Sequence, residues 1–393
     1  MIFVTKQHSL FADEYNQLTE VVYHVVYGNT LLSFEWVEGL RGLLLIECYA
    51  WPLRILNLLG LDTAFFVRYN IYVLHILYLI FGDFYFLKFG QAYLGTKSLD
   101  LAFLLRVTSA IYADFMSRPF GNTVEEILFL CGAYYFKRVY DGSSSTKHIW
   151  RFALVVPVSF LIRNTAAILW FPPLIWILVN KPRLIPFFFA TTIPLFLFSL
   201  VNDYRFYGRW LIPFIQFATF NHDKFWHESP LFFIVVAVPA FLTLLTPATV
   251  LGGFQYFKRS RETQVVPWLV YIPALYIAFY SLNPHKEIRF ILPIVPILIF
   301  FAAQYLQSMF AGTSKVNAKR IVGVHLVVNA IVTLFLTQYI KVFPPIISAV
   351  KANSEIKDLY VFSWYDFPLY SEFHGSPIKI EHEVCELVSS SNS

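Results

Sequence analysis

Residues 283–300 read "NPHKEIRFILPIVPILIF". The Asn283-Pro284 pair ends any incoming helix, because a residue that precedes proline avoids the helical conformation. His285, Lys286, Glu287 and Arg289 then stand directly before a run of residues that carries no charge. The stretch therefore predicts a new apolar helix that begins beside a cluster of ionisable groups at the edge of a hydrophobic layer.

The composition extends this interpretation to the whole chain. Of its 393 residues, 57% are hydrophobic and 14% are charged, whereas soluble domains carry about 25% charged residues. Apolar segments near the ~20 residues that cross a bilayer recur from residue 63 to residue 342, and the ~10-residue alternating segments of a β-barrel are absent. We predict an all-α integral membrane protein. The formal charge of +5 is better explained by basic cytoplasmic loops than by nucleic-acid binding.

Hydropathy divides the chain into about ten spans. They are expected at residues 63–87, 99–115, 122–136, 150–162, 166–180, 185–202, 230–254, 266–282, 288–311 and 320–342. Residues 43–59 contain Glu47 and Arg54, so we expect this segment to lie flat on the membrane interface. Three regions follow: residues 1–62 form a lumenal loop with interfacial helices, residues 63–342 form the transmembrane bundle, and residues 343–393 form a lumenal C-terminal segment.

The basic residues predict the orientation. Threading the ten spans in order places every cluster of Lys and Arg in the short loops on one side, which the positive-inside rule makes cytosolic. Ionisable groups at or inside the apolar layer are costly and mark functional sites by default. On the opposite face they are Asp13, Glu14, Glu20, Arg118, Glu125, Arg163, Asp203, Arg205, His285, Lys286, Glu287 and Arg289. We therefore expect function on that face.

An acidic pair, Asp13-Glu14, precedes a helical pattern in "FADEYNQLTEVVYHVVYG". The pair can simply favour a helix N-terminus. A carboxylate that faces a lipid-bounded cavity is also what a general base for a sugar hydroxyl requires, because partial desolvation and a neighbouring acid raise its basicity. The spacing leaves both interpretations open.

Two segments place arginines near the membrane. In "SRPFGNTVEEILFL" (117–130), Asn122 and Glu125 share a helical face beside Arg118; alternatively, Asn122 caps the helix and Glu125 or Glu126 supports its first turn. In "SFLIRNTAAILW", Arg163 lies between two spans. Its guanidinium either reaches water from a span end or binds a lipid phosphate, whose oxygens match the planar fork of arginine.

The cations of the opening stretch raise an electrostatic problem. His285, Lys286 and Arg289 lie within the first turn of a predicted helix, whose N-terminus is already partly positive. An anion such as a lipid phosphate would resolve the conflict. Anchoring to headgroups is the alternative.

The motifs resemble those of the dolichol-phosphate-mannose-dependent mannosyltransferases of the endoplasmic reticulum, a GT-C type family. "HKEIRFILPIVP" is similar to the family motif H-K-E-x-R-F-x-x-P, and "ADEYNQLTE" to P-D-E-x-(W/F)-Q-x-x-E. "RPFGNTVEE", "IRNTAAILW" and "DYRFYGRW" also match family segments, as does the tail "FSWYDFPLYSEFHG". The order of motifs looks most like the branch that adds the third mannose of the glycosylphosphatidylinositol (GPI) anchor.

The resemblance implies a lumenal, inverting transfer of mannose from dolichol phosphate mannose to a GPI precursor, with an α1,2 linkage. Asp13 would be the general base and Glu14 the second candidate. Five cations would bind the donor phosphate: His285, Lys286, Arg289, Arg163 and Arg118. Acceptor-binding or structural positions are Glu20, Glu35, Asn122, Glu125, Asp203 and Glu287. No metal or other cofactor is needed if these cations stabilise the leaving phosphate, which fits the lack of a DxD motif; the sequence identifies no protein partner.

The chain also departs from the family pattern. It begins almost at the acidic loop, where the family has a preceding span, and Ala12, Phe34 and Asn164 replace a proline, a tryptophan and a proline of the motifs. Two alternatives therefore stay open. One is a sister enzyme that adds the fourth GPI mannose or a mannose of the dolichol-linked oligosaccharide. The other is an inactive or non-catalytic membrane homologue, or a lipid transporter.

Overall fold

The computed structural model describes residues 15–28, 30, 32–142, 145–220, 229–262, 268–283, 285–339, 358–361 and 379–382. A π-helical turn, η1 (Tyr15–Thr19), opens the described chain. The helices that follow are α3 (Glu20–Tyr27), α4 (Phe34–Val37), α5 (Leu44–Leu58), α6 (Ala64–Leu94), α7 (Leu99–Thr108), α8 (Ala110–Met116), α9 (Gly121–Tyr140), α10 (Thr146–Ile162), α11 (Ala166–Asn180), η2 (Pro182–Leu184), α12 (Ile185–Tyr207) and α13 (Pro213–Phe220).

The second half is built in the same way. Its helices are η3 (Phe233–Ala237), α14 (Val238–Leu242), η4 (Thr243–Leu245), α15 (Thr246–Glu262), α16 (Trp268–Leu282), η5 (Ile288–Ile294), α17 (Val295–Ala311) and α18 (Lys315–Tyr339). Two short strands, β1 (Asp358–Val361) and β2 (Lys379–His382), pair in parallel with Asp358 opposite Lys379. These strands add a small element to the tail that the sequence analysis did not predict, while the all-α class of the bundle is confirmed.

Each predicted span coincides with a helix or with consecutive helices. Among the described residues, five helical segments are long and apolar enough to cross a membrane: 69–94, 182–207, 233–260, 288–311 and 315–336. The helices α11 and α16 are apolar but shorter. The structure therefore agrees with a membrane protein of many spans, and the number ten stays a prediction, as do the three region boundaries.

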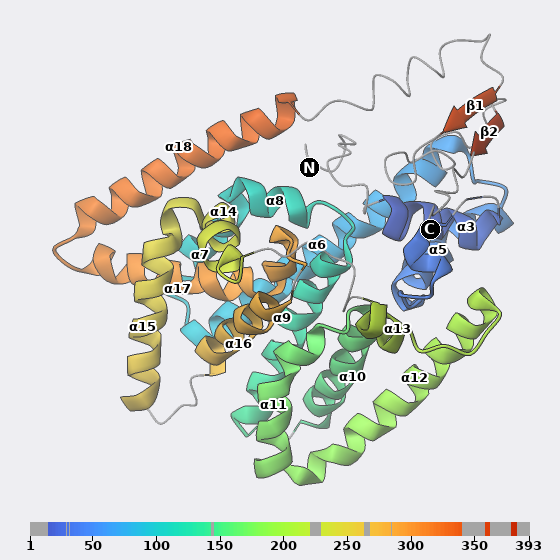
Figure 1. Ribbon diagram of the computed structural model, residues 1–393. Coiled ribbons are helices and arrows are strands. Elements are labelled where there is room, and N and C mark those ends of the chain that lie inside the picture. Colours follow the sequence, from blue (N-terminus) through green and yellow to red (C-terminus); the bar gives the residue numbers. More distant parts are fainter. Residues whose placement is uncertain are drawn as a thin grey trace, which may run out of the picture.

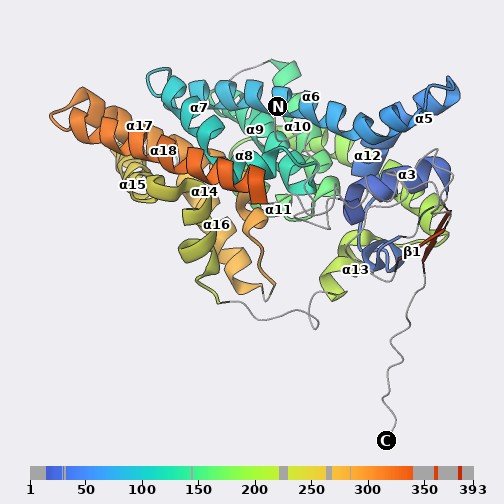
Figure 2. The same ribbon diagram turned by 90° about the horizontal axis from the view of Figure 1, so that it is seen from above.

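The helix α17 is the most buried of the long apolar helices in the described part of the chain. In the most apolar window of the Ile288–Ala311 span, 83% of the residues are buried, against 11% for Pro182–Tyr207 and for Lys315–Leu336. The helices α9 to α11 lie in the middle of the molecule, α15, α17 and α18 lie at one end, and α3, α5 and the two strands lie at the other (Figures 1 and 2). Because lipid solvates apolar side chains as well as protein does, peripheral helices such as α12 and α18 can leave an apolar face uncovered.

Two predicted spans are broken in the middle. The span at 99–115 divides into α7 and α8 at Ser109, and the backbone N–H of Ala110 donates to the side-chain oxygen of Asn329 on α18 at 2.8 Å. The span at 230–254 breaks at Thr243, whose φ of 49° is the one positive value among the described non-glycine residues. The Thr243 hydroxyl contacts His325 Nδ1 at 3.0 Å and accepts from Asn329 at 3.3 Å. Polar side chains of α18 thus satisfy backbone and hydroxyl groups at both breaks, as an apolar environment requires.

The helices α15 and α17 approach very closely at Gly252. A Cβ atom built on Gly252 would lie 1.9 Å from the carbonyl oxygen of Phe301, which is a backbone atom and cannot rotate away. Glycine is therefore required by the packing of these two helices, as at other close helix contacts in membranes.

We predict that Gly252→Ala forces α15 away from α17 and destabilises the protein by about 1–3 kcal/mol, the usual cost of overpacking. Thermal denaturation of the detergent-solubilised protein should show a lower midpoint. Gly323→Ala is the control, because nothing lies within 4 Å of a Cβ at that position of α18. Equal midpoints for the two variants would contradict the close approach.

Candidate functional site

The break between α10 and α11 brings Arg163 to the start of α9. Arg163 adopts an extended conformation (φ −145°, ψ 120°) directly after α10, and α11 begins three residues later. Its side-chain stem lies against Gly121, where a built Cβ would be 3.4 Å from Cγ and Cδ of Arg163 and 3.7 Å from a methyl group of Leu45 on α5. The break between α10 and α11 therefore packs the stem of Arg163 against the start of α9, which also lies close to α5.

Arg163 is held by groups from α9 and from its own turn. Its Nε lies 3.0 Å from Oε2 of Glu125, and its Nη1 donates to Oδ1 of Asn122 at 3.0 Å. The hydroxyl groups of Thr165 and Tyr276 donate to Oε1 of Glu125 at 3.0 and 3.4 Å. Within the described residues, Nη2 of Arg163 has no hydrogen-bond partner. The guanidinium is thus held at Nε and Nη1, and its Nη2 is open to a further acceptor.

This arrangement decides between the two interpretations of residues 117–130. Phe120 occupies the N-cap of α9, without a side-chain hydrogen bond, and Asn122 is the second residue of the helix. The capping role considered for Asn122 is therefore wrong, and its side chain binds Arg163 instead. The Glu125 side chain is fully buried, so its carboxylate depends on Arg163, Thr165 and Tyr276 for its partners.

The residues of the opening stretch form their own ion pairs. Glu287 accepts from Nη2 of Arg289 at 2.9 Å, lies 2.8 Å from its Nε through the other oxygen, and contacts Nε2 of His285 at 2.8 Å. Burial alone would raise the pKa of Glu287, but His285 and Arg289 lower it to about 2. The protein thus supplies one counter-ion where the sequence analysis expected only an external anion. Lys286 and Arg289 are both buried, and Lys286 donates to the carbonyl of Asn283 at 2.5 Å.

The two groups of cations are neighbours across the ring of Phe290. This ring lies 5.9 Å from the guanidinium of Arg163 and 5.6 Å from the imidazole of His285. Arg289 is also close enough for its charge to act on Arg163, and the short helix η5 packs against α9. The site therefore lies where α9, η5 and the α10–α11 break meet, at the ends of α11 and α16.

Arg118 has a separate counter-ion. Its Nε and Nη2 donate to the two oxygens of Asp114 at 3.3 and 3.2 Å, and both residues are buried. Together, Arg118, Arg163, Lys286 and Arg289 face three carboxylates, Asp114, Glu125 and Glu287. Counted over these described side chains, the formal charge is +1 with His285 neutral and +2 with it protonated, which favours an anion.

Asp203 and Glu35 do not pair with these cations; they make a separate set of hydrogen bonds between the end of α12 and the chain before α5. The Asp203 carboxylate accepts from the backbone N–H of Leu43 at 2.8 Å and from the Ser199 hydroxyl at 3.3 Å. Glu35 accepts two hydrogen bonds from Arg41, at 2.9 and 3.1 Å, and the Tyr207 hydroxyl donates to the Arg41 carbonyl at 2.7 Å. The end of α12 thereby fixes the chain that leads into α5, whose first turn lies close to Gly121.

The other predicted positions are placed less directly. Glu20 is buried in the small core that α3 forms with α5, and its backbone carbonyl accepts from the Thr30 hydroxyl at 3.4 Å. Asp13 and Glu14 lie outside the described residues, and their proposed catalytic roles stay predictions. Among the described residues, no three His, Cys, Asp or Glu side chains gather as a metal site.

The sequence analysis missed a second buried ionic network on the other side of α9. Arg106 of α7 lies 2.8 Å from Oε1 of Glu126 and 3.0 Å from the half-exposed Asp83, and it also donates to Tyr112. The Tyr112 hydroxyl donates to the same Glu126 oxygen at 2.5 Å. A lone arginine within the predicted 99–115 span was the signal, because such a residue requires a partner.

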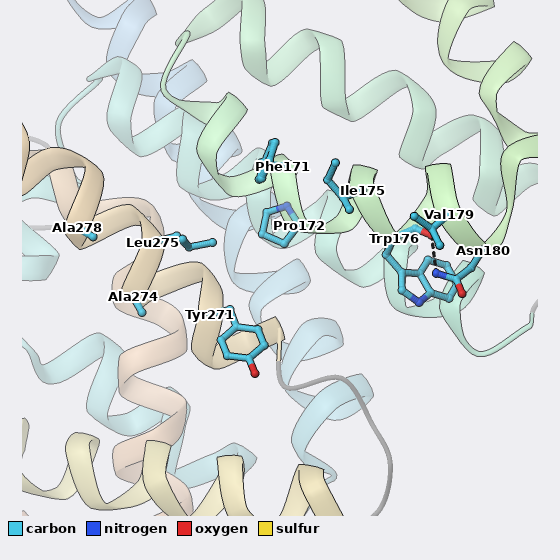
Figure 3. Close-up of a pocket in the computed structure, with 10 residues that line it drawn as sticks. All are labelled: Phe171, Pro172, Ile175, Trp176, Val179, Asn180, Tyr271, Ala274, Leu275 and Ala278. Carbon is cyan, nitrogen blue, oxygen red and sulfur yellow. Dashed lines mark hydrogen bonds between the residues drawn. The ribbon is translucent and has the colours of Figure 1, made fainter.

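An apolar groove of about 660 Å³ separates α11 from α16 (Figure 3). Its walls are Phe171, Pro172, Ile175, Trp176, Val179, Asn180, Tyr271, Ala274, Leu275 and Ala278. The helix α11 begins beside Arg163, and Tyr276 of α16 contacts Glu125. One end of the groove therefore points toward the cation site, and the groove extends away from it for about 14 Å along α11.

Comparison with known proteins gives consistent matches. The model of the Alg9-like mannosyltransferase family matches residues 1–374. The chain is 25% identical over 320 residues to mannosyltransferase APTG1 of Arabidopsis thaliana, covering 77% of this chain and 56% of that protein. It is 29% identical to GPI mannosyltransferase 3 of Yarrowia lipolytica, covering 83% and 63%, and 27% identical to human GPI alpha-1,2-mannosyltransferase 3, covering 77% and 55%. The chain thus spans less than two thirds of the length of these relatives.

A solved structure confirms the predicted GT-C type fold. ArnT from Cupriavidus metallidurans bound to undecaprenyl phosphate superposes with a TM-score of 0.64 at 12% identity, covering 94% of this chain and 80% of ArnT. At this identity the likeness concerns the fold alone.

We predict that Glu126→Leu destabilises the protein strongly, by about 3–5 kcal/mol, because it leaves the Arg106 charge buried without its main partner. Arg106→Met combined with Glu126→Leu should recover part of the loss, since the buried Arg106–Glu126 pair is then removed as a whole, while Asp83 still loses its partner. Thermal denaturation in detergent of the unmodified chain, the single variants Glu126→Leu and Arg106→Met, and the double variant measures this. A double variant as unstable as the sum of the two single variants would contradict the Arg106–Glu126 ion pair.

Proposed function

The chain belongs to the Alg9-like mannosyltransferase family, and on that premise we propose that it transfers mannose from dolichol phosphate mannose to a GPI anchor precursor. The proposed product is the third mannose in α1,2 linkage, since several relatives carry the name GPI mannosyltransferase 3 or GPI alpha-1,2-mannosyltransferase 3. We place the reaction at the lumenal face of the endoplasmic reticulum membrane, on the side opposite the basic loops.

The observation that carries the proposal is the guanidinium of Arg163, in which only some of the N–H groups have partners. Glu125 contacts Nε and Asn122 accepts from Nη1, both at 3.0 Å, and Nη2 has no hydrogen-bond partner in the described part of the chain. A phosphate oxygen is the partner that an open guanidinium N–H group fits best. The neighbouring Arg289, Lys286 and His285 add positive charge that would stabilise the phosphate as it leaves with the lipid, which is worth several kcal/mol of barrier lowering.

The two glutamates of the site would act as positioning groups. Glu125 orients Arg163, and Glu287 orients Arg289 together with His285. Because each guanidinium already has a carboxylate along one side, it does not need to reorganise when the phosphate binds. Preorganised charges of this kind lower a barrier more than mobile ones do.

We further propose that the polyprenyl chain of the donor lies in the groove between α11 and α16. The groove is lined almost entirely by apolar side chains (Figure 3) and leads toward the end of α11 next to Arg163. A long lipid with an anionic head requires such a combination, since the head needs cations and the tail needs an apolar wall.

The acceptor hydroxyl would attack the anomeric carbon of mannose in a single displacement that inverts its configuration. Asp13 would take the hydroxyl proton, with Glu14 as the second candidate. The bond from the anomeric carbon to the phosphate oxygen breaks as the new glycosidic bond forms, and the phosphate departs still attached to dolichol. The residues named here require no metal ion for these steps.

We predict that Asp13→Asn abolishes transfer, because an amide cannot accept the proton of the acceptor hydroxyl. The measurement uses microsomes that express this chain and lack the native enzyme for the third GPI mannose. Radiolabelled mannose is supplied as dolichol phosphate mannose, and the glycolipid products are identified.

Asp100→Asn is the matched control, since Asp100 is an exposed acid at the start of α7. It should leave turnover unchanged. Normal turnover by the Asp13 variant, at equal protein level, would contradict the assignment of Asp13 as the general base. If only Glu14→Gln loses activity, Glu14 is the general base instead. A label that enters the dolichol-linked oligosaccharide instead of a GPI precursor would contradict the proposed acceptor.

A further inference from the structure

A second cationic region lies at the opposite end of α9 from the candidate site. It is formed by the end of α9, the start of α10 and one residue of α6, and we name it the tyrosine–arginine cluster. Its members are Tyr85, Tyr134, Tyr135, Arg138, His148 and Arg151. Asn122 and Arg138 are separated by sixteen positions of one helix, so the cluster is about 24 Å from the Arg163 site along the helix axis.

Stacking on tyrosine rings fixes both arginines of the cluster. The guanidinium of Arg138 lies 5.2 Å from the ring centre of Tyr134, and that of Arg151 lies 5.5 Å from the ring centre of Tyr135. Arg151 donates to the Tyr135 hydroxyl at 3.1 Å, and this hydroxyl also contacts that of Tyr85 at 2.6 Å. The ring centres of Tyr134 and Tyr135 are 5.2 Å apart. The two guanidinium groups therefore lie against neighbouring tyrosine rings.

The cluster contains no acidic group. In the described part of the chain, the side-chain hydrogen bonds of Arg138 and Arg151 go to tyrosine hydroxyls and none goes to a carboxylate. Nearby Asp141 is paired with Lys137. The ring of His148 lies 5.9 Å from that of Tyr135, and burial first, and then the charges of Arg138 and Arg151, lower the pKa of His148. The two guanidinium groups therefore lack a carboxylate hydrogen-bond partner in the described part of the chain, and an external anion can take that place.

The surroundings place the cluster at a lipid–water boundary. Trp150 and Leu154 of α10 are 43% and 45% exposed, and Phe84 of α6 is 52% exposed. Leu154 follows Arg151 by three residues, so it lies on the same face of α10, one turn deeper in the bundle. Tryptophan beside basic residues is typical of membrane interfaces, and the basic loops predict that this one is cytosolic.

We propose that the tyrosine–arginine cluster binds the phosphate of an anionic phospholipid in the membrane leaflet that surrounds this end of α9 and α10. The two guanidinium groups contact the phosphate oxygens, and the exposed apolar side chains contact the acyl chains. This site is independent of the proposed transfer reaction and of the donor site.

Native mass spectrometry of the full chain in detergent, titrated with phosphatidylinositol or phosphatidylcholine, tests the proposal. We expect preferential retention of phosphatidylinositol. A basic side chain near an anionic lipid surface contributes about fivefold in affinity, so the variant with both Arg138→Gln and Arg151→Gln should bind phosphatidylinositol about 25-fold more weakly. Both side chains are exposed, and an unchanged thermal midpoint should show that the variant folds.

The control carries Arg183→Gln and Lys315→Gln, two exposed cations of the same predicted side that lie outside the cluster. It should retain phosphatidylinositol as the unmodified chain does. An equal loss in the control and in the cluster variant would reduce the effect to general charge attraction and overturn the site. Equal retention of the two lipids, or displacement of the lipid by millimolar inorganic phosphate, would overturn the phospholipid as its ligand.

Discussion

The contact between Arg163 and Glu125 is the constraint around which the centre of the molecule is organised. A charge buried in an apolar bundle costs several kcal/mol unless it is paired and hydrogen-bonded. Glu125 is fully buried and therefore depends on the break that brings Arg163 into reach at 3.0 Å. Thr165 and Tyr276 complete its partners. This one carboxylate thereby ties α9 to the α10–α11 turn and to α16, and the groove between α11 and α16 follows from the same placement.

Two consecutive glutamates give α9 two different tasks. Neighbouring residues of an α-helix point about 100° apart, so Glu125 and Glu126 face different sides of the helix. Glu125 holds Arg163 at the candidate site, while Glu126 holds Arg106 and Tyr112 in the interior between α7 and α8. A rotation of α9 would break both ion pairs at once. These two ion pairs, on different sides of the helix, therefore fix the rotational position of α9 and with it the position of Nη2 of Arg163.

Hydropathy and motif spacing predicted the elements well because the bilayer imposes its thickness on each helix. The segment predicted at 166–180 coincides with α11, for example. The mid-span break at Ser109 was not predictable, because the group that satisfies the Ala110 amide is Asn329, 219 positions away. Asp203 was identified as a candidate, but its role at the amide of Leu43 depends on a contact across 160 positions. Glu287, by contrast, lies within two residues of His285 and Arg289, the cations with which it pairs, so the local sequence was enough to predict this contact.

The most direct measurement is an experimental structure of the full chain with dolichyl phosphate bound. The account predicts phosphate oxygens within hydrogen-bond distance of Nη2 of Arg163 and of Arg289 or Lys286, with Glu125 still on the Nε side of Arg163. It also predicts that the first isoprene units enter the groove between α11 and α16. A phosphate bound elsewhere, with Nη2 of Arg163 left without a partner, would contradict this assignment.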